Sequence, residues 1–563
     1  MTLKLRLAAS AAMVLLAAAP AAAQRGGAAE FVGCDGFGAP TGGGDAMTRG
    51  IGGVTTLFSN ARTTAQLRRQ VPTLGSLGIQ NCTAALADPR LEPGHALRRA
   101  SLVHGRAMHR LSINDSAAAM EDLALAEQSA AGGGPLFERS FGLSLRLARA
   151  FAMLNLDDKA GAARISSAIL ADRPYEPGVA FSAAQIHFAA TREWDGYFAR
   201  IRQLAAVDPS MIGSLFTLSM IRGQYEDAIA LHPQIVFTLP RNRGEYRVQG
   251  LHERAADQVA LRAFFDGAYA FALQTRGDAA GADAALAAAR ANLELALAPP
   301  PPREDGRGPG RQQRQRHAAV SQVSDRATEA LGDWERHVRL RRLVAAGEID
   351  QVIAELENKP VAPDAAALDL FEQMVRARPA LRATVGTALG PLRERIYADV
   401  ERMMAFTVAD LAGRLPEPES PARVPNYEPA GASFRIRAND DYRMPSGPLA
   451  GVQTVRYASE RGSISTAGEL ALLRAAQLAR DTGRKGFIVI ARRSLIRTVQ
   501  TSGLGYSMER ASGQEVELDV LLVDPDNLPR DYAQARWRVL DPDAIWTALS
   551  PVYRAPAAAT PAS

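Results

Sequence analysis

The chain has 563 residues, a length that leaves room for about two to four domains. Hydrophobic residues make up 47% of the sequence but aromatic residues only 6%, and alanine and leucine dominate, which favours helix over strand. The formal net charge of +5 is a weak basic bias, too small to indicate a nucleic-acid binder.

Residues 1–23 have the layout of a secretory signal peptide. Lys4 and Arg6 precede the apolar run Leu7–Ala19, Pro20 ends any helix, and small side chains lead to a cleavage point after Ala23. The run is shorter than the ~20 residues that a membrane-spanning helix needs. A buried N-terminal helix is the alternative reading. We expect a periplasmic or secreted protein without a transmembrane segment.

Residues 24–93 form a lead-in rich in Gly and Ala, predicted to be irregular up to about residue 60. It holds both cysteines, Cys34 and Cys82, and an even, minimal count in an oxidising compartment predicts one disulfide. Neither cysteine has a Cys or His at ligand spacing, so a metal site is the weaker alternative. Residues 31–34 faintly resemble a lipobox, but charged and small residues separate them from the apolar run. No lipid anchor is therefore expected.

Residues 94–298 read as paired amphipathic helices separated by Gly, Pro and Asp. The helices are expected at 95–111, 115–130, 136–154 and 158–171, with later pairs at 178–206, 209–231 and 255–297. Alanines recur 12 apart, at positions 107 and 119, 150 and 162, and 270 and 282. Small side chains at matching points let two antiparallel helices approach closely. Gly223 and Gly277 stand where tight turns between helices need an unhindered residue.

These features resemble a degenerate form of the tetratricopeptide repeat family. The matching stretches are Gly277–Ala282 with Leu286 and Ala289, Gly223–Ala228, and Ala162 with Ile169 and Pro174. The family's Trp near the start of the first helix is missing, and the spacing departs from its period of ~34 residues. A generic all-helical domain is the alternative. Either reading implies stacked helix pairs with a concave face.

Residues 299–316 read as an exposed linker. Pro299–Pro302 ends the preceding helix. The arginines that follow are candidate contacts for an acidic partner or for anionic head groups, and the alternative is a solvated loop without a partner. These arginines are Arg303, Arg307, Arg311, Arg314 and Arg316. Helix resumes over 317–415. Trp334 and Val338 are expected in one long helix, and the last long helix is expected to end near Leu415.

Residues 416–432 are a proline-rich linker, and 433–555 are predicted to fold as a small α+β domain followed by a disordered tail at 556–563. Strands are expected at 434–438, 452–457, 487–490 and 516–523. A helix is expected to begin in a Thr466/Glu469 capping box and to run to Gly483. A short helix at 542–549 is expected to close the domain. Glu469–Ile490 and Asp541–Trp546 resemble a family of small lipoproteins of bacterial envelopes. That family has no established enzymatic activity, so the resemblance implies an envelope location.

No residue constellation with catalytic geometry stands out. The eight histidines are scattered, and signatures of zinc proteases, serine hydrolases and nucleotide-binding loops are missing from the sequence. Asp440, Asp524 and Asp526 follow predicted strands, where carboxylates can hold a cation or act as acid and base. Aspartate beside proline or asparagine is also common in turns, and we favour this structural interpretation. We therefore expect no catalytic, cofactor-binding or metal-binding residues.

The expected fold class is mainly α, with a tetratricopeptide-like helical-repeat region followed by a small α+β domain. The expected function is an exported scaffold or adaptor that binds another envelope protein, with no cofactor and no nucleic acid. Peripheral contact with the membrane is compatible with this reading. The alternatives are an envelope hydrolase or a small-ligand binder with its site between the helical and C-terminal domains.

Overall fold

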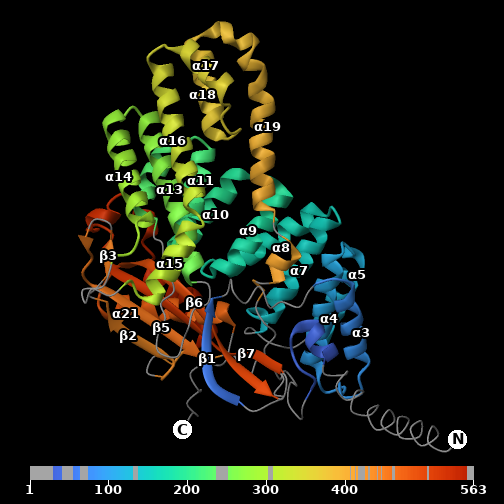
Figure 1. Cartoon of the computed structure of the whole chain (residues 1–563). Helices are drawn as coiled ribbons and strands as arrows, with labels where there is room; N and C mark the ends of the chain where they lie inside the picture. The colour runs from blue at the N-terminus through green and yellow to red at the C-terminus, as the bar shows by residue number, and fades with distance from the viewer. Residues whose placement is uncertain are drawn as a thin grey trace, which may run out of the picture.

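The structure is a computed structural model. It describes residues 29–40, 55–63, 74–130, 137–235, 251–301, 308–405, 407–412, 414–415, 425–428, 431–439, 442–444, 447–459, 463–503 and 506–554. The fold is mainly α, with a small α+β domain at the C-terminal end. Figure 1 shows the helices above and beside the sheet. The expected signal peptide, residues 1–23, lies outside the described residues.

The helical region consists of helix pairs that follow one another along the chain. Its helices are α3 (Ser76–Ala87), α4 (Ala96–Ser112), α5 (Ser116–Ser129), α7 (Phe141–Asn155), α8 (Lys159–Asp172), α9 (Pro177–Thr191), α10 (Trp194–Val207), α11 (Ile212–Ile221), α12 (Tyr225–Leu231), α13 (Leu251–Thr275) and α14 (Ala279–Leu297). From α4 onward each helix packs against its pair partner, and the second helix of a pair packs against the first helix of the next. The observed bounds agree closely with those expected from the sequence.

The same turn connects many of these pairs. The backbone N–H of the residue directly after a left-handed residue donates to the carbonyl five residues earlier, over 2.9–3.0 Å, at Asp115, Asp158, Gln224, Asp278 and Glu348. The left-handed residues before them are Asn114, Asp157, Gly223, Gly277 and Gly347. Such turns close the end of one helix, and the following Asp caps the next helix by accepting from its first-turn N–H groups.

The alanines 12 apart lie in the two helices of a pair, in α4 and α5, α7 and α8, and α13 and α14. Ala107, Ala119, Ala150, Ala162, Ala270 and Ala282 are all fully buried. Because a methyl group is the largest side chain that fits there without displacing a helix, these positions set how closely the pairs approach. Their burial supports the close approach expected from the sequence, which stays a prediction.

The helical region continues beyond residue 308 in a second group of helices. They are α15 (Arg311–Ser321), α16 (Ser324–Ala345), α17 (Ile349–Asn358), α18 (Ala365–Ala377), α19 (Val385–Met404) and α20 (Val408–Ala412). α16 packs along α13, with Trp334 against Phe264 and Phe271. The single helix expected to end near Leu415 is wrong, because the chain leaves the helix at Ala405 and starts a separate short helix, α20.

The predicted linker at 299–316 is wrong in its second half. α15 begins at Arg311, and Gly310 N–H donates to the side chain of Gln313 over 2.9 Å at its start. Between Pro309 and Pro360 the sequence has no proline, and Arg, Gln and Ala are good helix formers, so helix competes successfully with an open loop. α15 packs against α13, with Val320 buried.

The α+β domain is built on an antiparallel sheet in the order β1-β6-β7-β5-β2. Its elements are β1 (Thr55–Thr63), β2 (Phe434–Ala438), β5 (Val452–Ser459), α21 (Ile464–Asp481), β6 (Gly486–Gly503), β7 (Tyr506–Val523) and α22 (Pro542–Tyr553), and β3 (Arg443–Met444) pairs with β4 (Gly447–Pro448) beside it. Val516, Leu518 and Val520 of β7 share a core with α21 and α22. Leu521 and Val523 pack with Tyr532 in a second core.

The edge strand β1 departs from the sequence expectation. Thr55–Thr63 lies in the lead-in predicted to be irregular up to about residue 60, yet it pairs antiparallel with β6, for example Thr63 with Leu495. Its sequence alternates weakly between apolar and polar residues and is flanked by glycine, so nothing local marks a strand. Backbone hydrogen bonds to the edge of β6 therefore stabilise this strand, although its own sequence does not favour one.

Candidate functional site

The first helices of successive pairs form one row. α4 packs directly against α7, and α7 packs directly against α9, in addition to their contacts within pairs. We call the surface that this row of helices presents the inner face of the helix pairs. Apolar side chains of α4, α7 and α9 belong to one continuous core.

The short helix α20 lies against this row. It packs against α4, and Val408 and Leu411 are buried in the same core as the apolar residues of α4, α7 and α9, at 8% and 0% exposure. Ala412 and Leu415 are partly buried against that core. The inner face therefore already holds a short apolar helix.

Arg414 extends this contact to α9. One of its guanidinium Nη atoms donates to Gln185 Oε1 over 2.6 Å, and the guanidinium stands 4.9 Å from the ring centre of Phe181. Since α4 and α9 flank α7, the segment from Val408 to Arg414 reaches across the row.

α19 brings the chain back to the stack before α20. In Figure 1 it runs from the outlying α17 and α18 toward α8 and α9. Arg192 pairs with Glu401 over 2.6 Å, and the rings of Trp194 and Tyr397 lie 5.9 Å apart. The chain is thus fixed at the turn between α9 and α10 before it reaches the inner face.

A buried ionic cluster joins the helix pairs to the α+β domain. Glu469 of α21 is 0% exposed and accepts from Arg173 Nε over 2.7 Å and from Arg139 Nη2 over 3.1 Å. The hydroxyl of Tyr553 in α22 donates to it over 2.6 Å. Arg173 also donates to the carbonyl of Arg139 over 2.6 Å. We call these four residues the junction.

The charges of the junction stabilise one another. Burial alone raises the pKa of Glu469, but Arg173, Arg139 and the hydrogen bond from Tyr553 outweigh it, so the pKa lies below its ordinary value. Burial and the adjacent Glu469 raise the pKa of Tyr553 well above its ordinary value, so this hydroxyl stays a donor. The arrangement suits a structural role, because Glu469, Arg173 and Tyr553 are buried, Arg139 is partly buried, and the four side chains bind one another.

The junction was missed by the sequence prediction. The Thr466/Glu469 capping box is wrong, since Ser463 caps α21 by accepting from Thr466 N–H, and Glu469 points into the interface instead. A glutamate within the apolar run Ala467–Leu473 is a signal that a charged partner is needed. Arg139 and Arg173 lie more than 290 residues away in sequence, which no local pattern reveals.

The predicted site residues are dispersed. Cys34 and Cys82 form the expected disulfide. Arg311, Arg314 and Arg316 lie exposed on α15, while Arg303, Arg307 and Asp440 fall outside the described residues. Asp524 accepts from Arg484 over 2.7 Å and Asp526 from Arg536 over 3.2 Å, both in surface turns. The structure does not bring these two aspartates together with Glu469.

Buried charges also line the sheet face opposite α21. Arg493 of β6 pairs with Asp519 over 2.6 Å and with Glu517 over 3.2 Å, and Thr454 of β5 donates to Asp519 over 2.6 Å. Both carboxylates are about as buried as the core side chains, at 1% and 2% exposure. Since each has charged or hydroxyl partners, the cluster explains how this face tolerates acidic residues.

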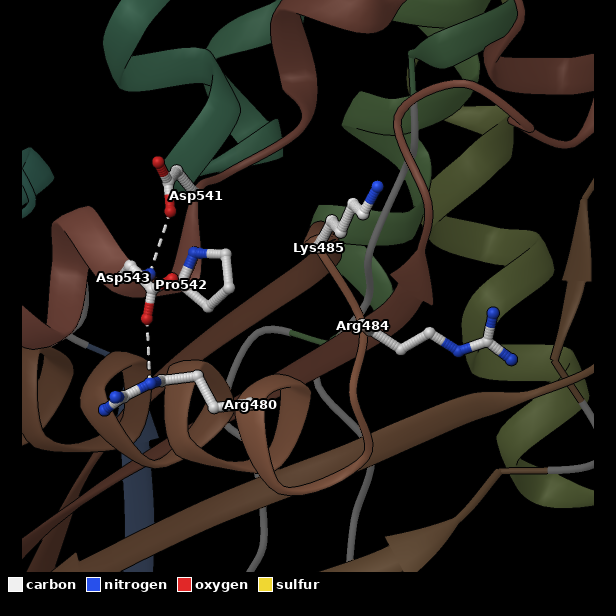
Figure 2. Close-up of a pocket in the computed structure, with 6 residues that line it drawn as sticks. All are labelled: Arg480, Arg484, Lys485, Asp541, Pro542 and Asp543. Atoms are coloured by element: carbon white, nitrogen blue, oxygen red, sulfur yellow. Dashed lines mark hydrogen bonds and ion pairs between the residues drawn. The ribbon is translucent and has the colours of Figure 1, made fainter.

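A shallow pocket of about 410 Å³ lies where α21 ends and α22 begins, lined by Arg480, Arg484, Lys485, Asp541, Pro542 and Asp543. Figure 2 shows that Arg480 faces Asp543 while the Arg484 side chain extends away from them. Arg480 pairs with Asp543 over 2.8 Å, and Asp541 already accepts from the first N–H groups of α22. The basic side chains therefore do not converge on one point.

Comparisons with family models, with curated proteins and with solved structures find no match to this chain. In the described part of the chain, no helix combines the length and the apolar character needed to cross a bilayer. Within the same residues, the His, Cys, Asp and Glu side chains form no cluster of three or more suited to a metal ion.

Proposed function

We propose that this protein is an exported scaffold or adaptor that binds a segment of another envelope protein on the inner face of its helix pairs. The observation that carries the proposal is the placement of α20, whose Val408 and Leu411 are buried against that face. A surface that accepts a short apolar helix of its own chain has the shape and chemistry for helix-in-groove recognition. The tetratricopeptide-like pattern of the sequence supports the same reading.

The proposed location rests on the signal-peptide pattern of residues 1–23 and on the Cys34–Cys82 disulfide. Disulfides persist in oxidising compartments such as the periplasm and are rare in the cytosol. The resemblance of the α+β domain to small envelope lipoproteins agrees with this location. We propose that this domain, fixed to the helix pairs by the junction, supplies a second contact.

The proposal includes no catalysis. The hydrolase alternative needs Asp440, Asp524 or Asp526 to meet a His or Ser across a cleft between the two domains. Asp524 and Asp526 instead pair with arginines on exposed turns, and the carboxylate that does lie between the domains, Glu469, is enclosed by Arg139, Arg173 and Tyr553. These contacts favour the scaffold.

Site-specific photo-crosslinking in the native envelope tests the proposal. A photoreactive residue is placed at Phe181 of α9, which contacts Arg414 on the inner face, and at exposed apolar positions elsewhere on the helix pairs, Leu125, Leu261 and Leu295 in turn, with exposed Asp526 of the α+β domain for comparison. We expect at least one helix-pair position to yield a recurrent protein adduct, identified by mass spectrometry. The absence of any recurrent adduct, together with turnover of an envelope substrate by the purified protein, would overturn the proposal.

A further inference from the structure

We propose that α20 is a resident occupant of the inner groove, and that a partner binds by displacing it with a short helix of the same chemistry. The groove is the surface of α4 and α9 that contacts Val408, Leu411 and Arg414. This inference rests on the proposed scaffold function and specifies its partner. The partner segment would be a short helix with apolar residues at i and i+3, followed directly after its end by an arginine or lysine and a further apolar residue.

The segment around α20 has the features of a self-contained recognition motif. Thr407 and Asp410 cap each other, because Thr407 N–H donates to the Asp410 carboxylate over 3.0 Å and Asp410 N–H donates to Thr407 Oγ1 over 3.2 Å. Val408 and Leu411 are three residues apart on one face of α20, and Leu415, beyond the end of the helix, is partly buried against the same core. The sequence therefore carries its own helix start and its own apolar stripe.

The groove supplies a matching contact for each part of the motif. Its apolar floor encloses Leu411 completely and Val408 almost completely. Phe181 presents a ring face to the Arg414 guanidinium, and Gln185 accepts a hydrogen bond from it. An aromatic face and an amide oxygen both favour a cation over a neutral or acidic side chain.

α20 can leave without separating the parts of the molecule that it connects. A five-residue helix is far below the length at which helices are stable alone, so its order depends on the groove. On one side, α19 is held independently by Arg192–Glu401 and Trp194–Tyr397. On the other side, the α+β domain is held by the junction. A segment with few contacts between two independently fixed elements belongs to the least stable part of a fold.

Tethering makes α20 a strong competitor despite its few contacts. A covalently linked segment is present near its site at an effective concentration of the order of millimolar. The apparent affinity of a partner is reduced by the fraction of molecules whose groove is occupied. Disabling α20 should therefore increase the affinity for any segment of the same chemistry.

A peptide with the sequence of residues 405–416, labelled with a fluorophore, tests the inference on the full chain by fluorescence anisotropy. Leu411→Asp in the protein removes the resident helix from the groove, because it places a charge in the apolar floor. Ala409→Asp adds the same charge on the exposed side of α20 and is the matched control. We expect the peptide to bind the Leu411→Asp protein at least about tenfold more tightly than either the wild type or the control.

Two further measurements keep the outcome decisive. Arg414→Ala weakens the hold on α9 without introducing a buried charge, and it should also increase peptide affinity. A peptide carrying Asp in place of its leucine at position 411 should bind none of the proteins. The inference would be overturned if the first peptide bound the wild type and the Leu411→Asp, Ala409→Asp and Arg414→Ala variants with equal affinity. It would also be overturned if the peptide bound none of these four proteins. In that case a crosslinked partner at Leu125, Leu261 or Leu295 would still support the scaffold function, so the two failures are distinguishable.

Discussion

Arg173, at the end of α8, donates a hydrogen bond from its Nε to Glu469 Oε1 over 2.7 Å, and both side chains are at most 1% exposed. The pair links the helix pairs to the α+β domain, so the relative position of the two parts depends on it. Removing one partner of a buried ion pair leaves the other charge buried without compensation.

Glu469→Gln is expected to lower the free energy of unfolding by about 3–5 kcal/mol, because the buried Arg173 and the partly buried Arg139 would then lose their counter-charge. Urea denaturation followed by circular dichroism measures the change. Asp543→Asn removes the carboxylate of an exposed pair with Arg480 and should cost less than about 1 kcal/mol. Losses of similar size in the two variants would contradict the role given to the junction.

The same carboxylate predicts a dependence on pH. Arg173 and Arg139 keep the pKa of Glu469 below its ordinary value despite burial. Its contribution to stability is therefore fully present above the unfolded-state pKa of about 4.3 and is lost as the pH falls through the folded-state pKa. The difference in unfolding free energy between the wild type and Glu469→Gln should shrink on acidification in this window. A difference that widens would count against the assignment.

His104 predicts a second, separate pH effect. Burial lowers its pKa to about 4, and its ring lies against Phe141 with 5.4 Å between centroids. The unfolded chain takes up the proton first, so stability should fall as the pH drops from about 6.5 to about 4, by roughly 3 kcal/mol in all. His104→Leu should flatten this part of the stability profile. A His104→Leu profile as steep as that of the wild type would show that another group titrates.

The helix crossings predict the effect of a larger side chain. Ala162 of α8 is fully buried, and Ala168 of the same helix is exposed. Ala162→Leu should lower the melting temperature and cost about 1–3 kcal/mol, since a leucine forces α7 and α8 apart. Ala168→Leu adds the same atoms to the same helix in solvent and should have little effect. Thermal unfolding of both variants provides the comparison, and equal melting temperatures would refute the close approach.

The parts of the fold predicted from the sequence are those with a local signal. Apolar periodicity, glycine at the left-handed turn positions and aspartate caps predict the helix pairs within a few residues, as at Gly277 and Asp278. The strands at 434–438 and 452–457 were also found, because alternation marks them. β6 and β7 extend well beyond the predicted segments, since their ends depend on pairing with each other.

The candidate site could not be predicted because its contacts are distant in sequence. α20 reads as the end of a long helix until the structure shows the break at Ala405 and the contact with α4. Gln185 and Arg414 are 229 residues apart, and the sequence around either residue gives no sign of the contact between them. The Thr407/Asp410 cap followed by Leu411 is a recognisable helix start, and it was the one local sign of a separate element.

The pairing of β1 with β6 has a consequence for how the chain folds. Thr63 pairs with Leu495, so a strand near the beginning of the chain must wait for one synthesised more than 400 residues later. Contacts of such long sequence separation form slowly, because the intervening chain must be ordered or closed into a loop first. The sheet should complete only after β6 and β7 have been synthesised. Any product truncated before β6 would leave β1 without its partner strand, a form suited to recognition by chaperones and proteases.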